Sequence, residues 1–433
     1  MRIQQQVLNF LSTHNISPSV TLRLALSGGL DSCVLLHALL EAQKSLNFNL
    51  QAMHVHHGLS ANADAWAEFC AKTCAAYAVP FGLVKVNVEP SSGLGVEATA
   101  RNARYQALLK DDVDFVMLAH HQDDQAETFL LQMLRGAGLK GLSAMAAKAV
   151  DKRLLRPLLD VSRQEVEAYA KAAKLSWVED ESNADTQYDR NFCRHEIMPA
   201  IQSRFPAAAV TFARSAGHIA EAATLLDDLA VLDAQSAIVD GKVNVLALKA
   251  LSAPRAKNLL RWWLASLNIA MPNKDKLDET LAQLINAKAD ASLKINLEGV
   301  NIRRYQDLAY IETPALTLPI SLIWQGEPSL TMPDGSQLMF EHTRGQGLAI
   351  DRLGGHKLRI ASRTGGERFK PDLARPTRTL KHLLQEANMP PWLRERLPLV
   401  YLDDALAVVP NVGVSCQMQA GEGERGLVIT WQA

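Results

Sequence analysis

The fold of this 433-residue chain is decided by the stretch Leu24-Ala25-Leu26-Ser27-Gly28-Gly29-Leu30-Asp31-Ser32. Apolar residues lead into two adjacent glycines, and the run 34–40 that follows is typical of a helix. A strand, a glycine turn and a helix together aim free backbone N–H groups and a helix N-terminus at an anion. The stretch therefore predicts a phosphate-binding loop, in which Asp31 holds a Mg²⁺ that the phosphates share. The alternative is an ordinary turn with Asp31 as a helix cap. No Gly-Lys-Ser/Thr follows, so this is not a Walker A loop.

Composition places the chain among ordinary globular proteins of two to four domains, with 48% hydrophobic and 21% charged residues and a net charge of −1. The N-terminus lacks the pattern of a signal peptide, and no apolar run is long enough to span a bilayer. The five cysteines form neither a disulfide framework nor a Cys-x-x-Cys pair. We therefore expect a cytoplasmic protein that does not associate with a membrane.

Strand and helix patterns alternate through the first half of the chain, which predicts a parallel, doubly wound sheet. Strands are expected at the glycine stretch and at 50–59, 81–88 and 115–119. In such sheets ligands bind beyond the carboxyl ends of the strands. The glycine loop, the cluster His54–His57 and the cluster His120–Glu127 all fall at such ends. Together they predict one site at this edge of the sheet.

The segment His120–Thr128 begins a helix that carries several acidic residues. Asp124 and Glu127 lie three residues apart and hence on one helix face, while His120 lies four before Asp124. Acidic residues in a first turn can simply complement the helix dipole. Beside a phosphate loop, we interpret His120, Asp124 and Glu127 as metal and substrate residues. A zinc site at His54, His56 and His57 is disfavoured, because strand side chains alternate and no fourth ligand is evident.

A long helix expected at 207–238 leads out of the first domain. Two helices (254–267 and 272–287) and three short strands follow, typical of a small helical or α+β middle domain. The segment 314–319 marks a linker, and the remainder predicts a small α+β domain. We expect a catalytic domain at 1–215, a middle domain with its linker helix at 216–313, a linker with short strands at 314–350, and a basic C-terminal domain at 351–433.

Basic residues gather in the last domain. Residues 352–396 include eleven Lys and Arg residues but only four Asp and Glu residues, a local excess of +7 in a chain of net charge −1. The basic residues are Arg352, Lys357, Arg359, Arg363, Arg368, Lys370, Arg375, Arg378, Lys381, Arg394 and Arg396. The excess favours a surface that binds a phosphate backbone over a merely solvated face.

Several strings together resemble the tRNA(Ile)-lysidine synthetase family, within the PP-loop ATP pyrophosphatases. They are Ser27–Ser32, His54–Leu59, Glu97 with Arg101 and Tyr105, His120–Thr128, Arg135–Leu142, Arg156–Leu159, Glu179–Arg194, Arg363–Glu367 and Pro390–Arg394. The resemblance covers most of the chain. It implies a ligase that forms a carbon–nitrogen bond, joining free lysine to C2 of the wobble cytidine of a minor isoleucine tRNA. ATP would first adenylate the base and release pyrophosphate, and lysine would then displace AMP.

The resemblance also implies roles for individual residues. The catalytic residues would be Asp31, His120, Asp124 and Glu127, with Asp31 and Asp124 as Mg²⁺ ligands and either Asp124 or Glu127 as the partner of the lysine amine. ATP would be bound by Ser27, Gly28, Gly29, Leu30, Asp31, Ser32, Met53, His54 and Arg101. The tRNA would be bound by Arg135, Lys140, Arg190, Arg194, Arg368 and Lys381. The predicted partners are tRNA, ATP and lysine, and a homodimer is allowed.

Three other functions are weighed against this one. A PP-loop tRNA thiolase acts on a similar C2 oxygen but needs a catalytic cysteine or an iron–sulfur site, and Cys33 is expected to point into its helix. A synthetase that uses ammonia would require a glutaminase domain with an N-terminal nucleophilic cysteine, which is absent from the sequence. A simple nucleotide- or RNA-binding module would not need His120 and the carboxylates together.

Overall fold

A computed structural model of the chain describes residues 2–58, 60–86, 96–111, 113–287, 293–297, 299–313, 319–374 and 376–432. The expectations for Leu59, for most of the linker at 314–319 and for Arg375 lie outside these ranges, and the side chains of Glu97 and Arg352 are not described either. The chain forms two compact units, 1–228 and 229–433, which we describe separately.

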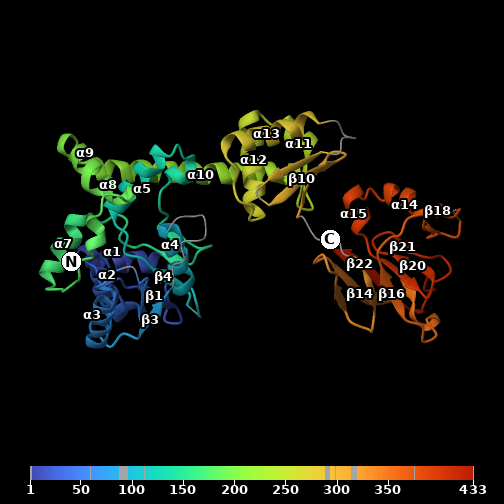
Figure 1. The fold of residues 1–433 in the computed structure, drawn as a ribbon, viewed down its shortest axis with the longest axis horizontal. Helices are drawn as coiled ribbons and strands as arrows, with labels where there is room; N and C mark the ends of the chain where they lie inside the picture. Colours follow the sequence, from blue (N-terminus) through green and yellow to red (C-terminus); the bar gives the residue numbers. More distant parts are fainter. Residues whose placement is uncertain are drawn as a thin grey trace. The chain divides into compact units, whose positions relative to one another are not determined.

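The first unit is built on a six-stranded sheet, and the prediction of a parallel, doubly wound sheet is confirmed (Figure 1). Its strand order is β3-β2-β1-β4-β6-β5, and all neighbours are parallel except β5 and β6. The strands are β1 Thr21–Ala25, β2 Asn49–His56, β3 Phe81–Lys85, β4 Phe115–Met117, β5 Lys148–Ala149 and β6 Leu154–Leu155.

Helices cover both faces of this sheet, as Figure 1 shows. One core joins β1 to α1 Arg2–Thr13, α2 Leu30–Leu46, α3 Ala63–Ala76 and α7 Arg163–Ala172. On the other face, α4 Val96–Leu108 packs its buried Leu108 near Val116 and Leu118. Strand β1 is covered on both faces, and even Arg23 is buried, with its guanidinium donating to the carbonyls of Leu108 and Lys110.

The strand order fixes where a ligand can bind. From β1 the chain moves outward to β2 and β3, and it then returns to the opposite side of β1 to form β4 and β6. This reversal between β1 and β4 leaves a crevice at their carboxyl ends, because the following segments diverge to opposite sides. The glycine loop follows β1, and His120 follows β4.

The remainder of the first unit forms the rim of that crevice. Its helices are α5 Gln122–Leu134, α6 Leu139–Leu142, a 3₁₀ turn at Glu181–Ala184, α8 Asp189–Phe192, a π-helical turn at Cys193–Ile197 and α9 Met198–Arg204. The segment Arg135–Leu142, one of the strings that carry the resemblance, thus contains the short helix α6. The long helix expected at 207–238 is α10 Ala208–Ala237, and the division between the two units falls within it.

The second unit begins with a five-stranded antiparallel sheet of order β7-β8-β11-β10-β9. Its strands are β7 Ile238–Val239, β8 Lys242–Asn244, β9 Lys294–Leu297, β10 Val300–Tyr305 and β11 Leu308–Glu312. The helices α11 Val245–Ala250, α12 Ala253–Ser266 and α13 Lys274–Asn286 share a core with it around the buried Trp263. These elements agree with the expected α+β middle domain.

The C-terminal part contains two larger antiparallel sheets and a two-stranded one. Their strands are β12 Ser321–Ile323, β13 Ser329–Thr331, β14 Gln337–Arg344, β15 Leu348–Ala349, β16 Leu358–Ala361, β17 Arg368–Phe369, β18 Arg378–Thr379, β19 Leu399–Leu402, β20 Ala405–Val409, β21 Gly413–Val414 and β22 Arg425–Gln432. Helices α14 Leu380–Glu386 and α15 Pro391–Arg396 complete it. Because β12 pairs with β16 and β14 with β22, the short strands expected at 314–350 share sheets with the residues after 351. The exact domain boundaries stay a prediction. None of the described helices is long and apolar enough to cross a bilayer.

Candidate active site

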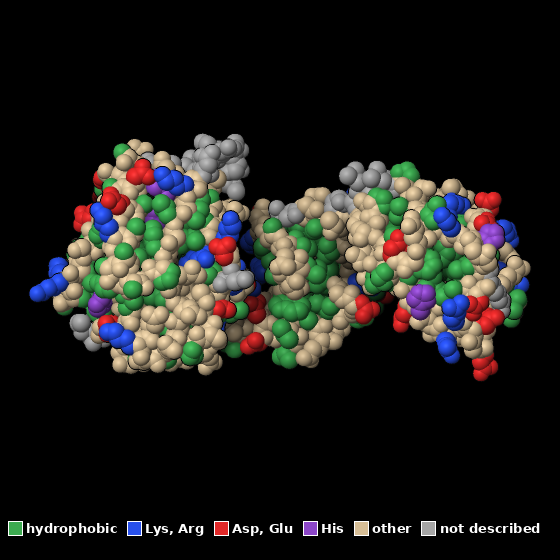
Figure 2. Space-filling view, turned by 90° about the horizontal axis from the view of Figure 1, so that it is seen from below, with side chains coloured by type: hydrophobic (Ala, Val, Ile, Leu, Met, Phe, Trp, Pro, Cys, Tyr) green, Lys and Arg blue, Asp and Glu red, His purple; other side chains and the backbone are tan. Residues whose placement is uncertain are grey.

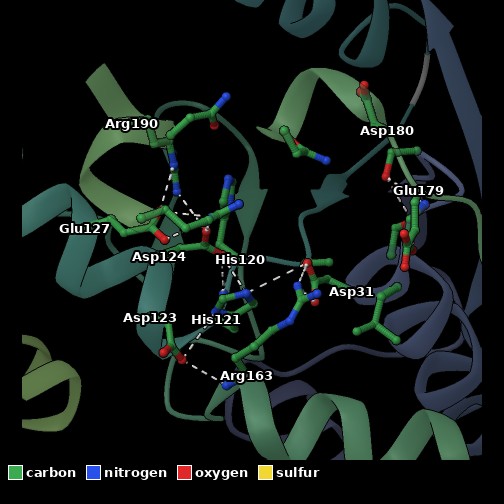
Figure 3. A pocket seen from close by; sticks show the side chains of 18 of the residues that line it. Asp31, His120, His121, Asp123, Asp124, Glu127, Arg163, Glu179, Asp180 and Arg190 are labelled. Atoms are coloured by element: carbon green, nitrogen blue, oxygen red, sulfur yellow. Dashed lines mark hydrogen bonds and ion pairs between the residues drawn. The ribbon is translucent and has the colours of Figure 1, made fainter. Parts of the chain in front are cut away.

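A cavity of about 850 Å³ opens at the crevice between β1 and β4 (Figure 3). One wall is formed by the glycine loop and the start of α7, another by the start of α5 with the turns after Tyr188, and a third by the segment 177–184. These segments lie far apart in the sequence. The glycine loop and the His120–Glu127 cluster both line this cavity, whereas no residue of the third expected cluster, His54–His57, belongs to its described lining.

The glycine loop presents the start of α2 to the cavity. Gly29 is the N-cap residue, and no side chain caps the helix. The Ser32 hydroxyl donates to the carbonyl of Gly29 at 2.9 Å and accepts from the Ser27 hydroxyl at 3.1 Å, so both hydroxyls are used within the loop. A helix N-terminus without a side-chain cap attracts anions, since its first N–H groups and its dipole point outward.

Gly28 joins the loop to the third wall. Its φ of +89° strains any residue with a side chain, and a Cβ atom there would lie 2.9 Å from Val178 Cγ2 and 3.1 Å from Cys70 Sγ. The N–H of Val178 donates to the carbonyl oxygen of Gly28 at 2.9 Å. Glu179 and Asp180, which follow Val178, line the cavity opposite α5 (Figure 3).

Asp31 is held by a residue that the sequence did not single out. Nη1 of Arg163 lies 3.0 Å from Oδ1 and 3.1 Å from Oδ2 of Asp31. Burial raises the pKa of Asp31, and the charges of His121 and Arg163 act against that rise. His121 Nε2 lies between two carboxylates, 3.8 Å from Asp31 Oδ2 and 3.5 Å from Asp124 Oδ2.

Asp124 and Glu127 lie side by side on α5, as the spacing predicts, and are almost completely buried. Two arginines bind them: Arg190 Nη2 and Arg194 Nη2 lie 2.9 and 2.8 Å from Asp124 Oδ1. Arg190 Nε and Arg194 Nε lie 3.1 and 2.6 Å from the two oxygens of Glu127. We call these residues, Asp124, Glu127, Arg190 and Arg194, the four-residue charge cluster.

Electrostatics favour the ionised form of Asp124. Burial alone would raise the pKa of Asp124, but the charges of His121, Arg190 and Arg194 outweigh burial and lower it. Asp124 also accepts the backbone N–H of His121 at 2.9 Å, so it contributes to a capping box at the start of α5. Arg190 and Arg194, expected to hold tRNA, bind carboxylates here. Arg194 belongs to a π-helical turn, a feature frequent at functional sites.

His120 lines the cavity but precedes α5, so it does not share the helix face of Asp124. Burial lowers its pKa to about 3, which makes the imidazole neutral at physiological pH. Its Nδ1 has no hydrogen-bond partner among the residues that the structure describes. A neutral imidazole can donate one hydrogen bond to a developing anion but brings no positive charge to it.

The described lining of the cavity does not include Met53, His54 or Arg101. Met53 and His54 lie on β2, one strand away from the crevice, and there the Met53 carbonyl accepts from Leu26 N and His54 Nδ1 lies 2.9 Å from Leu26 O. The guanidinium of Arg101 is exposed and lies over the ring of Tyr105. Arg104, one turn further along α4, lines the cavity instead.

Other lining residues were also missed by sequence reasoning. Arg104 has no ion-pair partner within the described ranges, and burial lowers its pKa. Trp66 and Trp177 contribute aromatic surface to the lining. The spacing of Arg101, Arg104 and Tyr105 indicates a helix but not which arginine faces the cavity. No local signal marks the tryptophans, since the fold alone brings them to the cavity.

The remaining basic residues expected to bind tRNA lie on the surface. Arg135 Nη2 is 3.2 Å from Asp189 Oδ2, and Lys140 Nζ is 3.1 Å from Asp227 Oδ2, with both basic side chains more than half exposed. Such exposed pairs contribute little to stability and are readily opened.

The basic residues of the C-terminal part are partly neutralised. Arg378 pairs with Glu386, Arg363 with Glu367, and Arg396 binds Asp334 at 2.8 Å. On the face seen in Figure 2, basic and acidic side chains of this part are interspersed rather than gathered in one patch. Arg368 and Lys381 are exposed, and Arg368 donates to the carbonyl oxygen of Thr377 at 3.2 Å.

The cysteines give no support to a thiolase. Cys33, Cys70 and Cys74 are buried, and burial raises the pKa of their thiols to about 12, 12 and 11. Such thiols remain protonated and poorly nucleophilic. Among the described residues, no group of three or more His, Cys, Asp and Glu side chains is arranged to hold a metal by itself, as a zinc site at His54–His57 would require.

Comparisons with known proteins cover nearly the whole chain. Family models match residues 1–201 as a PP-loop domain, 244–310 as a TilS substrate binding domain and 358–431 as a TilS substrate C-terminal domain. The tRNA(Ile)-lysidine synthase of Nitrosomonas europaea is 43% identical over 425 residues, which cover 96% of this chain and 93% of that protein. That of Azoarcus sp. is 41% identical over 420 residues, covering 96% and 92%. Among solved structures, the U34-tRNA thiolase NcsA from Methanococcus maripaludis is 19% identical with a TM-score of 0.45, covering 51% of this chain and 78% of that one.

Proposed function

The chain belongs to the tRNA(Ile)-lysidine synthase family, and from this premise we propose how its cavity carries out the reaction. The enzyme is an ATP-dependent ligase with tRNA and ATP as substrates. The nucleophile is free lysine, and the acceptor is C2 of the wobble cytidine of a minor isoleucine tRNA. The observation that carries the proposal is the shared cavity, where the phosphate loop, His120 and the four-residue charge cluster all face one space.

ATP binds with its pyrophosphate part at the start of α2. The backbone of Gly28, Gly29 and Leu30 forms the cradle, and the hydrogen bonds from Ser27 to Ser32 and from Ser32 to the Gly29 carbonyl keep it in shape. The C2 oxygen of cytidine attacks the α-phosphate, and pyrophosphate leaves. Arg104, which the cavity lining favours over Arg101, binds the phosphate that is attacked. Neutral His120 donates a hydrogen bond to the charge that develops there.

A Mg²⁺ ion fits the donor groups on one side of the cavity. Mg²⁺ prefers one or two carboxylates together with substrate phosphates, and Asp31 and Asp124 present such oxygens on either side of His121 Nε2. Burial raises the pKa of Asp31, which indicates a carboxylate that is incompletely compensated by its neighbours. Asp31 and Asp124 would hold the ion, which would neutralise charge on the phosphates when bound.

Lysine enters on the side of the four-residue charge cluster. Its side-chain ammonium first loses one proton, and the resulting amine attacks C2 of the adenylated base. AMP leaves with the former C2 oxygen, and a second proton leaves the nitrogen to solvent. Asp124 and Glu127 are the carboxylates that attract the ammonium group and receive its first proton, and they stay equal candidates for that role. Because Arg190 and Arg194 bind both carboxylates, lysine must compete with the two guanidinium groups for them.

The tRNA reaches the cavity with its wobble base splayed out of the anticodon loop, as single-stranded bases are usually recognised. Trp66 and Trp177 offer aromatic faces on which a base or the adenine can stack. Arg135 and Lys140 contact the anticodon loop from the rim, together with Arg190 and Arg194 where these leave the carboxylates. Arg368 and Lys381 contact phosphates further away. The reaction takes place in the cytoplasm, and a homodimer stays a prediction that sedimentation analysis would test.

The decisive experiment is incorporation of labelled lysine into RNA. Purified protein is incubated with ATP, labelled lysine and bulk tRNA, and the label in RNA is counted with and without ATP. ATP-dependent incorporation, with one AMP and one pyrophosphate released per lysine, supports the proposal. Release of pyrophosphate without lysine in the RNA would point to another nucleophile and would overturn it.

A further inference from the structure

Arg163 has hydrogen-bonding capacity that the protein itself does not use. Its Nη1 binds both oxygens of Asp31, and its Nε donates to Glu167 Oε1 at 3.0 Å. Nη2 makes no hydrogen bond to any residue within the described ranges, and the side chain is 41% exposed. Two N–H donors therefore remain available to a ligand in the cavity that Arg163 lines.

Hydrogen bonds fix the backbone of Arg163 at the start of α7. Arg163 is the first residue of α7, and its backbone N–H donates to Asp123 Oδ2 at 2.9 Å. Ser162 and Glu165 form a capping box that fixes the same end of the helix. Figure 3 shows the side chain extending from α7 toward Asp31 across the lower part of the cavity. The guanidinium thus lies beside the phosphate loop, although α7 is 132 residues away in sequence.

Arg163 can offset the repulsion between Asp31 and a phosphate bound at the start of α2. The Asp31 carboxylate belongs to the same loop and would repel the phosphate oxygens. A planar guanidinium held against Asp31 can bind oxygens of the carboxylate and of a phosphate with different N–H groups. Arg190 and Arg194 differ in this respect, because each of them binds two buried carboxylates.

We propose that Arg163 binds the terminal phosphates of ATP beside the phosphate loop, through hydrogen bonds donated by its Nη2. The pyrophosphate released from ATP is bound by the same hydrogen bonds. The inference rests on the proposed function for the identity of the nucleotide. It predicts that Arg163 contributes to the affinity for ATP and for pyrophosphate. AMP has no terminal phosphates, so its affinity does not depend on this residue.

The test compares Arg163→Ala and Arg163→Lys with Lys171→Ala, a control on the exposed last turn of the same helix. Isothermal titration calorimetry measures the affinity of each full-length protein for ATP, pyrophosphate and AMP in the absence of tRNA. Arg163→Ala should weaken ATP and pyrophosphate binding about 10- to 100-fold, as expected for the loss of a charge-assisted hydrogen bond. Arg163→Lys should lie between wild type and Arg163→Ala, and AMP binding should stay within about 2-fold. Thermal unfolding shows whether each variant is folded.

A second comparison separates a direct contact from an effect through Asp31. Pyrophosphate binding without Mg²⁺ is measured for Asp31→Asn and for the double variant Asp31→Asn with Arg163→Ala. If Arg163 touches the phosphate, the second change weakens binding in the Asp31→Asn protein by a similar factor. If Arg163 only holds Asp31, the second change has no effect and the inference is wrong. A wild-type protein that incorporates no lysine would instead overturn the proposed function and leave these pyrophosphate measurements unaffected.

Discussion

The cavity of the first unit and the C-terminal part of the second both carry many charged residues, yet they use them differently. In the cavity, partners come from distant segments: Arg190 and Asp124 are 66 residues apart, and Arg163 and Asp31 are 132 apart. In the C-terminal part, Arg363 pairs with Glu367 and Arg378 with Glu386 close in sequence, although Arg396 and Asp334 are 62 residues apart. The first arrangement builds a site, whereas the second neutralises a surface. A count of charges along the chain cannot tell the two arrangements apart, because it does not show which charges remain available to a ligand.

The largest expected effect comes from the phosphate loop. Asp31→Ala should lower kcat/KM for lysine incorporation by about 1,000-fold or more, since it removes the carboxylate that we propose holds Mg²⁺ beside the phosphate loop. Binding of tRNA to this variant, measured by filter retention, should stay within about 3-fold. Asp160→Ala is the matched control, because Asp160 is exposed and absent from the cavity lining. Near-normal turnover in Asp31→Ala would mean that Asp31 acts only as a helix cap and has no role in the reaction.

The next effect concerns the four-residue charge cluster. Asp124→Asn and Glu127→Gln should each slow lysine transfer about 100-fold while changing ATP affinity by less than about 5-fold. Rapid-quench measurement of lysine transfer and calorimetry with ATP would compare the two effects. Glu196→Gln, an exposed change in the neighbouring π-helical turn, serves as the control. If both variants keep the wild-type KM for lysine and its turnover, the amine does not bind to this cluster.

Changes in the C-terminal part should have a smaller effect, on tRNA binding. Deleting residues from Pro319 onward should raise the KM for tRNA about 10-fold or more while ATP binding persists, since residues 1–228 form a compact unit. Among single changes, Arg368→Ala and Lys381→Ala should each flatten the salt dependence of tRNA binding by about one phosphate contact.

Arg396→Ala is the control for these two substitutions. Arg396 is half-buried against Asp334, so its loss should lower the stability of the protein but leave the salt dependence of tRNA binding unchanged. Binding isotherms at several salt concentrations provide the measurement. If Arg368→Ala and Lys381→Ala leave the slope unchanged, the basic excess is only a solvated face.

The smallest effect is a dependence of stability on pH. The pKa of His120 is lowered to about 3 in the folded protein, whereas an unfolded histidine titrates near 6.5. Between these values the unfolded chain binds one more proton, so the stabilisation present above pH 6.5 is lost as the pH falls toward 3. Each pH unit in this window should cost up to about 1.4 kcal/mol.

Urea unfolding of wild type and His120→Gln at pH 7, 6 and 5 would measure that slope. The variant should show the shallower dependence on pH. Equal slopes in the two proteins would mean that His120 stays accessible to protons in the folded state.

Sequence reasoning succeeded where one short segment carries both the fold and the chemistry. The alternation of strand and helix patterns predicted the parallel sheet, and the spacing of Asp124 and Glu127 predicted their common helix face. It did not find Arg163 or Trp177, because their contacts depend on which strand lies next to which. The order β2-β1-β4 also explains why Met53 and His54 lie outside the described cavity lining: they lie on β2, the neighbour of β1 on the side away from β4.

The hydrogen bond from Val178 N to the carbonyl oxygen of Gly28 has a consequence for binding kinetics. It ties the phosphate loop to the backbone that carries Glu179 and Asp180, and Val178 also fills the space where Gly28 has no Cβ. We therefore expect a displacement of the loop to move the facing wall as well. Two substrates that are coupled in this way change each other's affinity by the same factor, by thermodynamic reciprocity. The concentration at which one substrate half-saturates its site then depends on whether the other substrate is bound.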